Sequence, residues 1–440
     1  MLRNMRPAVL LSYAAFVLVG LNAGASGVLL LAQMGDYGVD RPAIGITFFT
    51  GAIGFVLAGL SNGALIGRLG IRTALAVGGG TYVLAGLYLA TRPPFAAFVA
   101  VPLVTGYATG VLESVLNVYL AALPDATTLL NRLHAFFGVG ALLGPLLAAW
   151  IVSAASWRMV SLVLAVACVP LVVGFLTAYP GRPAAGTAAP SGAASGSSGS
   201  LLGAALRDPG VLLGAAMLAV YVGLELSVGN WGFSYLVQAR ALPESLASYT
   251  ISGYWLGLTA GRFLISPAAG RIGATEVSMM YACLAGVIGT AALAWLSPAA
   301  VLASAALVLL GFFLGPVFPT TMAIAPRLTS ARLAATAIGV MNAGSMVGGA
   351  ALPWLAGAIG QSRGVWTLLP FTVTLALLQL AVWRSLAGRI RAPRAVGGLA
   401  GGRLRSSRCQ NRGTSSPCSG CCAAARGRSP PSRRCPSSTS

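Results

Sequence analysis

Two of the chain's eight carboxylates fall inside long apolar stretches, and these two are the residues best suited to chemistry. Glu113 lies in the run GVLESVLNVYL at 110–120, and Glu225 lies in the run YVGLELSVGN at 221–230. The remaining acids fall at predicted helix ends or in loops. An ionised acid at the centre of a membrane helix costs about 2.5–3.5 kcal/mol, and protonation or pairing relieves this cost. A carboxyl that is neutral in one conformation and ionised in another couples proton movement to the conformational change.

Neutral polar residues and aromatic residues accompany the two acids. Asn117 follows Glu113 by four residues, so both side chains project from one helix face, where they can grip a polyol or bond between helices. Further candidates for substrate contact inside predicted spans are Asn22, Asn230, Trp231, Tyr254, Trp255 and Asn342. The asparagines can equally hold helices together, and the aromatic rings can anchor at the lipid interface or pack. Arg262 can neutralise an acid or an anionic substrate, or form a contact of a cytoplasmic gate.

The composition places these residues in a membrane protein. The chain of 440 residues is 57% hydrophobic and 8% charged, whereas soluble domains carry about 25% charged residues. A helix of about 20 apolar residues crosses the hydrocarbon core of a bilayer. We therefore predict an all-α membrane protein with twelve transmembrane helices in two pseudo-symmetric six-helix bundles. The predicted spans are 8–33, 43–67, 72–91, 95–122, 129–155, 158–179, 209–238, 246–269, 274–297, 298–326, 331–360 and 363–388.

The basic residues predict how the chain is oriented. The net charge is +20, and arginines are more numerous at the span ends on the side of the N-terminus. The positive-inside rule then puts both termini in the cytoplasm of a multi-pass protein of the inner cell membrane. Because the arginines flank the spans, orientation and lipid headgroups explain them, and nucleic acid is not an expected partner.

The chain also divides into two halves that repeat each other. Gly67-Arg68-Leu69-Gly70 corresponds to Gly270-Arg271-Ile272-Gly273, and Gly140 and Gly144 correspond to Gly344 and Gly348 at nearly the same offset. Two repeated halves with a substrate site between them are typical of secondary transporters. The predicted parts are an N-terminal bundle at 1–180, a cytoplasmic linker at 181–207, a C-terminal bundle at 208–390 and a disordered basic cytoplasmic tail at 391–440.

The region between the second and third spans resembles the signature of the major facilitator superfamily, Gly-X-Leu-X-Asp-Arg-X-Gly-X-Arg. Gly63, Leu65, Arg68, Gly70 and Arg72 match it in register, and Gly67 replaces the aspartate. The family motif helps to gate the cytoplasmic side, so the resemblance implies gating roles for the matching glycines and arginines. Arg262 and Arg271 are further candidates for the gate.

Within that superfamily the chain is similar to the fucose/glucose/galactose–proton symporters. LESVLN at 112–117 follows the group's Leu-Glu-X-X-X-Asn pattern, and YVGLELSVGN at 221–230 follows its Tyr-Val-Gly-X-Glu pattern. LLNRLHAFFGVGALLGP at 129–145 resembles the group's Gly-rich fifth span. The resemblance implies alternating access and proton-coupled movement of a small polar solute, with a monosaccharide as the leading example.

Two other functions fit the same spans. An exporter of drugs or metabolites suits their very apolar character, and a non-transporting sensor or scaffold is an alternative of another class. We expect no enzyme, because the chain has one histidine and lacks a recognisable nucleophile–base set or phosphate-binding loop. We expect no cofactor and no metal, since Cys418 and Cys421 form a lone Cys-X-X-Cys pair. The expected partners are the solute, protons and the bilayer, and the expected state is a monomer.

Overall fold

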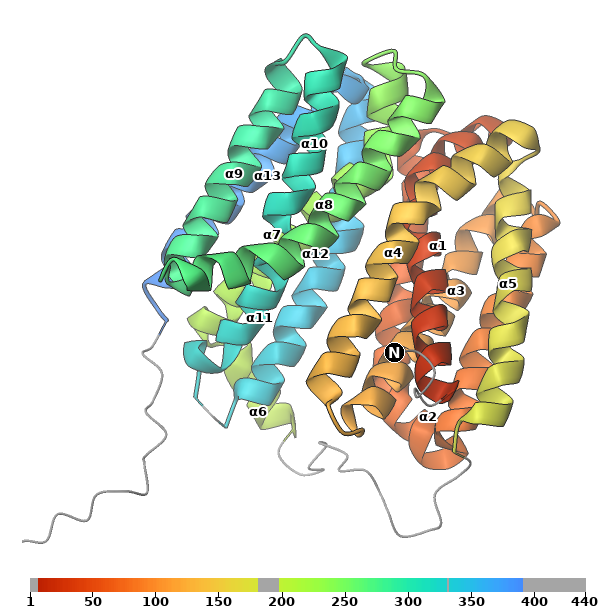
Figure 1. The fold of residues 1–440 in the computed structure, drawn as a ribbon, viewed down its shortest axis with the longest axis horizontal. Helices are drawn as coiled ribbons and strands as arrows, with labels where there is room; N and C mark the ends of the chain where they lie inside the picture. Colours follow the sequence, from red (N-terminus) through yellow and green to blue (C-terminus); the bar gives the residue numbers. More distant parts are fainter. Residues whose placement is uncertain (1–6, 181–197, 331, 391–440) are drawn as a thin grey trace, which may run out of the picture. The chain divides into compact units, whose positions relative to one another are not determined.

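The computed structural model describes residues 7–180, 198–330 and 332–390, and the regular structure within these ranges is helical throughout. Helices α1 to α5 form one bundle and helices α7 to α13 form the other (Figure 1). The first bundle consists of α1 (Pro7–Tyr37), α2 (Arg41–Ala90), α3 (Phe95–Ala121), α4 (Ala126–Ala154) and α5 (Trp157–Ala178). Then come α6 (Ser198–Ala205), α7 (Pro209–Gln238), α8 (Glu244–Arg271), α9 (Glu276–Leu296), α10 (Ala300–Leu314), α11 (Val317–Leu328), α12 (Ala334–Arg363), a 3₁₀ turn (Val365–Thr367) and α13 (Leu368–Ala387).

The number of membrane crossings agrees with the prediction of twelve. Ten helical segments in the described residues are long and apolar enough to cross a bilayer. One of them, α2, has 50 residues and is therefore about 75 Å long, enough for two crossings. It turns at Gly70, where φ is 79°, so it supplies the second and third predicted spans. The less apolar α8 completes the set, and α10 and α11 together form a single crossing.

Several acids that lie outside the interiors of the spans make structural contacts at helix ends. The Asp40 carboxylate accepts a hydrogen bond from the Ala43 amide and caps α2, and Asp208 caps α7 in the same way at Gly210. Asp36, near the end of α1, accepts hydrogen bonds from Arg92 and from Trp157, each at 2.9 Å. This interaction ties the ends of α1 and α2 to the start of α5. These acids therefore have structural partners at the helix ends.

The repeat seen in the sequence has a direct structural basis. Gly70 and Gly273 both have left-handed backbones, with φ of 79° and 70°, so each repeated motif ends in a turn that favours glycine. Gly140 and Gly144 on α4 lie against the backbone of α1, while Gly344 and Gly348 on α12 lie against α7. The pairing of α1 with α4 thus recurs as the pairing of α7 with α12, which is what two pseudo-symmetric bundles require.

Some predicted features fall outside the described residues. These are residues 1–6, residues 181–197 of the linker, and residues 391–440, which include the Cys418–Cys421 pair. The end of the predicted linker forms α6, and Ala205 at its last position is buried against Val211 and Ala337.

The α1–α4 contact leads to a stability prediction. A Cβ at Gly140 would collide with the backbone of Val17 and Gly20, whereas a Cβ at Gly59 on α2 would meet open space. We expect Gly140→Ala to lower the free energy of unfolding by about 1–3 kcal/mol, the usual cost of overpacking a tight contact. Gly59→Ala should leave it unchanged or raise it slightly, because alanine is the better helix former. Thermal unfolding of both variants in detergent measures the difference, and equal midpoints would contradict the tight contact.

Candidate functional site

A cavity of about 380 Å³ lies where the two bundles meet, within the range of about 300–1,000 Å³ typical of small-molecule sites. Its walls come from α1, α2, α3 and α5 of the first bundle and from α7 and α12 of the second. Most of the lining residues lie in the halves of these helices nearer the face opposite the N-terminus. We call this the far face; the arginine distribution predicts that it is extracytoplasmic.

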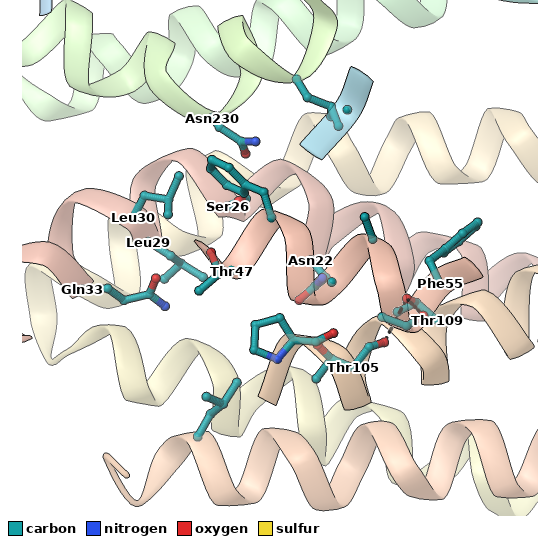
Figure 2. Close-up of a pocket in the computed structure, with 18 of the residues that line it drawn as sticks. Asn22, Ser26, Leu29, Leu30, Gln33, Thr47, Phe55, Thr105, Thr109 and Asn230 are labelled. Atoms are coloured by element: carbon teal, nitrogen blue, oxygen red, sulfur yellow. Dashed lines mark hydrogen bonds between the residues drawn. The ribbon is translucent and has the colours of Figure 1, made fainter. Parts of the chain in front are cut away.

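The polar groups of the cavity are all uncharged (Figure 2). Eight of the lining residues are neutral and polar, the rest are apolar, and none is an acid, an arginine or a histidine. Three of the eight, Thr47, Thr105 and Thr109, donate their hydroxyl protons to main-chain carbonyls of their own helices. Their oxygens can therefore accept hydrogen bonds from a solute. The eight residues are Asn22, Ser26, Gln33, Thr47, Thr105, Thr109, Ser161 and Asn230.

Two of the sequence candidates, Asn22 and Asn230, meet in this cavity from opposite bundles. Asn22 on α1 accepts a hydrogen bond at its Oδ1 from the hydroxyl of Tyr82, at 3.2 Å. Asn230 on α7 is only 8% exposed and lines the cavity. Sequence reasoning identified these two polar residues but missed the other six polar residues of the wall.

Glu113 and Asn117 lie next to the cavity along α3. Thr105, Thr109 and Glu113 are spaced by four residues, so Glu113 continues the lining face of the helix about 6 Å beyond Thr109. The Glu113 side chain is partly buried and does not itself line the cavity. Asn117 donates to the main-chain oxygen of Glu113 at 2.8 Å, so its amide binds the helix backbone and not the carboxylate. No ion pair or side-chain hydrogen bond to the Glu113 carboxylate occurs among the described residues.

Glu225 belongs to a buried charge cluster of the second bundle. Its carboxylate lies 3.5 Å from Nη2 of Arg262, and the same nitrogen lies 3.4 Å from the hydroxyl of Tyr221. Tyr254 donates to the main-chain oxygen of Glu225 at 3.0 Å. The cluster therefore joins α7 to α8, and Glu225 has a cationic partner that Glu113 lacks within the described part of the chain.

The other candidates for substrate contact have packing roles or lie elsewhere. The indole of Trp231 donates to the main-chain oxygen of Pro353 at 2.7 Å, and its ring meets Phe48 of the other bundle edge-on. Trp255 packs against Gly229 between α7 and α8. Asn342 is exposed on α12. None of these residues, nor Tyr254, is among those that line the cavity.

The gating candidates lie around the Gly70 turn in the middle of α2 and in the second half of α8. Gly63 and Arg68 are exposed, and Arg271 is exposed in the last turn of α8. Arg72 donates from Nε to the main-chain oxygen of Tyr179 at 2.8 Å, which ties α2 to the end of α5. Gly70 provides the left-handed turn of the motif. The contact of Arg72 lies within the first bundle and those of Arg262 lie within the second, so the structure does not assign these residues to a gate.

A latch that sequence reasoning missed joins the bundles at the far face. The guanidinium of Arg41, at the start of α2, donates to the side-chain oxygen of Gln361 on α12 at 3.0 Å and to that of Gln238 on α7. Beside it, the indole of Trp354 donates to the main-chain oxygen of Pro42. Arg41 precedes the cavity residue Thr47 by six positions, so the latch lies about 9 Å beyond the cavity. It therefore joins the two bundles on the far-face side of Thr47.

Two helical bundles with a small neutral cavity between them define a polytopic membrane transporter. Residues 12–353, and again residues 234–398, match the Major Facilitator Superfamily, so the chain belongs to this family and is a transporter of small solutes.

The chain is also similar to individual proteins and solved structures. "Bypass of stop codon protein 6" of Saccharomyces cerevisiae is 26% identical over 390 residues, which cover 80% of this chain and 76% of the yeast protein. The structure of the nucleoside transporter NupG has a TM-score of 0.71 at 17% identity and covers 88% of this chain and 100% of that chain. The structure of the E. coli fucose:proton symporter FucP has a TM-score of 0.59 at 16% identity and covers 86% and 98%. The family match confirms the superfamily, while these similar proteins do not single out the fucose/glucose/galactose group.

The latch at the far face can be tested by the accessibility of the cavity. In a background without native cysteines, Ser26→Cys places a thiol in the cavity wall. We expect Arg41→Ala to speed its reaction with a membrane-impermeant reagent, added at the far face, by roughly fivefold, because partly exposed charge-assisted hydrogen bonds contribute about 1 kcal/mol. Arg363→Ala, at an exposed arginine near the same face, is the matched control. Equal rates in the two variants would show that Arg41 does not hold the far face closed.

Proposed function

We propose that the protein carries a neutral polar solute, such as a monosaccharide or a nucleoside, across the membrane by alternating access and in company with protons. One observation carries this proposal. The cavity between the bundles is lined by neutral hydrogen-bonding side chains and apolar ones, without a charged group among its described lining residues. An anionic or cationic solute would be bound there without a counter-charge, which is costly in a low-dielectric site.

The printed functions of similar structures support this solute class. One is a nucleoside transporter and another is a fucose:proton symporter, and both transport solutes with several hydroxyl groups. Hydroxyl groups both donate and accept hydrogen bonds, and they match a wall that contains amide groups together with hydroxyl oxygens.

The arrangement of the bundles supports alternating access. The bundles meet in the far half of the molecule, through the Arg41 latch, Trp231 against Phe48, and Gly27 against the backbone of Gly229. In our proposal the N-terminal bundle, residues 1–180, and the C-terminal bundle, residues 208–390, rock about the cavity. Opening of the latch would then expose the solute at the far face.

We assign proton coupling first to Glu113 and second to Glu225. A carboxyl inside the membrane is stable as a neutral acid or as a paired anion. Glu225 has Arg262 at 3.5 Å, whereas the Glu113 carboxylate has no such partner in the described residues. Glu113 also continues the helix face that lines the cavity, where a change in hydration accompanies opening. A change of protonation is therefore easier to link to rocking at Glu113.

The solute class is tested by a ligand screen on purified protein. We expect D-galactose, L-fucose or uridine to raise the midpoint of thermal unfolding, since a ligand that binds the native state stabilises it. Gallate serves as the anionic comparison and a panel of toxic amphiphiles tests for export. Stabilisation by amphiphiles alone, with protection of expressing cells, would favour an exporter. No ligand-induced shift and no flux in vesicles would favour a sensor or scaffold.

The coupling residue is tested by Glu113→Gln. The amide keeps the shape of the carboxyl but cannot exchange a proton, so solute-driven proton uptake into vesicles should fall to background while the protein remains folded. Glu244→Gln, at an exposed acid in the first turn of α8, should leave the coupling unchanged. Normal proton uptake by Glu113→Gln would remove this residue from the mechanism, and the same assay on Glu225→Gln would then test the second assignment.

A further inference from the structure

The amide of Asn230 is the most informative polar group in the cavity. Asn230 is only 8% exposed, and its side chain has no hydrogen-bond partner among the described residues. It lines the cavity, and Figure 2 shows it pointing from α7 towards α1. The Asn230 amide atoms are not among the fully buried polar atoms that lack a partner in the described residues, so they open into the cavity, where a solute can bind them. Among the lining residues, Asn230 is the single polar side chain contributed by the second bundle.

Asn22 faces the same cavity from the first bundle, and its orientation is fixed. Tyr82, on the part of α2 that follows the Gly70 turn, is 5% exposed and donates its hydroxyl proton to Oδ1 of Asn22 at 3.2 Å. Tyr82 does not line the cavity. Because the amide oxygen is occupied by Tyr82, the amide nitrogen of Asn22 remains available to donate to a solute.

The distance between the two amides is set by a backbone contact. Gly27 on α1 lies directly against the main-chain oxygen of Gly229 on α7, and a Cβ at Gly27 would not fit there. Asn230 is the next residue after Gly229, and Asn22 lies about one and a half turns before Gly27 on α1. This close contact between α1 and α7 therefore lies directly beside Asn230 and about 7.5 Å along α1 from Asn22.

We propose that Asn22 and Asn230 bind the solute from opposite sides, one amide from each bundle, and that Tyr82 is a positioning residue for Asn22. This inference rests on the proposed function and deepens it. The solute it implies is neutral and polyhydroxylated, with an acceptor for the Asn22 amide nitrogen and a second hydrogen-bonding group for Asn230. Because each amide belongs to a different bundle, the solute bridges the halves when α1 and α7 are in contact.

Replacement of Asn230 separates a ligand contact from a structural role. Asn230→Leu keeps the approximate volume and removes the unpartnered amide. The midpoint of thermal unfolding without ligand should change little, since the Asn230 amide has no hydrogen bond to the described part of the protein to lose. Affinity for the tightest of D-galactose, L-fucose and uridine should fall roughly tenfold. A fall in stability without ligand together with unchanged affinity would overturn the role of Asn230.

Tyr82 is tested through its coupling to Asn22. Tyr82→Phe removes only the hydroxyl and should raise the KM of transport roughly five- to tenfold, with little change in the maximal rate. In an Asn22→Ala background, Tyr82→Phe should have no further effect, which a merely structural role would not produce. Tyr88→Phe, at a tyrosine on the same helix that is 46% exposed, is the control.

Different results would contradict the proposed solute class and the proposed role of Tyr82. If the unaltered protein is stabilised by none of the three probes, the proposed solute class fails and the amide pair fails with it. If the unaltered protein binds a probe and the Tyr82 effect persists without Asn22, then only the positioning role of Tyr82 is overturned.

Discussion

Close contact between helix backbones is the constraint on which this structure depends. In a bilayer, helices gain little from burying apolar side chains, so packing at small residues holds them together. Gly140 and Gly144 bring α4 against α1, and Gly348 brings α12 against α7. The same device recurs between the bundles at Gly27 and Gly229. Each bundle is thereby a tightly packed unit, and the register of α1 against α7 places the amides in the cavity.

The low-dielectric environment of the membrane also explains where the polar groups lie. Two of the acids have cationic partners: Glu225 lies beside Arg262 inside the second bundle, and Asp36 lies beside Arg92 at a helix end. The cavity wall, by contrast, has neutral amides and hydroxyls, which tolerate both an empty and an occupied site because water can replace the solute. A charged wall would be harder to desolvate each time the bundles close. Neutral polarity therefore suits a site that must bind and release its solute in every cycle.

The sequence was sufficient to predict the number of crossings, because a bilayer requires about 20 apolar residues per helix and this requirement is visible in any single chain. The repeat was also visible, since Gly70 and Gly273 are needed for left-handed turns and glycine is distinctive in sequence. The break between α10 and α11 was not predicted, because both pieces are apolar and together have the length of one span.

The site could be predicted only in part, because the faces of these helices are similar in hydrophobicity. In a membrane helix, the residues that face the protein interior are almost as apolar as those that face the lipid. Residue type was therefore the main guide, and it selected Asn22 and Asn230 as well as Tyr254 and Trp255. The first pair lines the cavity, and the second pair packs between α7 and α8. Thr105 and Thr109 had a usable signal, since they precede Glu113 on one helix face at intervals of four.

The latch had no comparable signal in the sequence. Arg41 is separated from Gln238 and Gln361 by 197 and 320 residues, and neither glutamine carries a charge that would mark it as a partner. The choice of neutral partners has a physical consequence. An arginine–carboxylate pair would close the far face more firmly but would also be harder to separate in a low-dielectric environment. Hydrogen bonds from Arg41 to two amide oxygens join the bundles while keeping the energy of separating them small, which is the balance that the proposed alternating access requires.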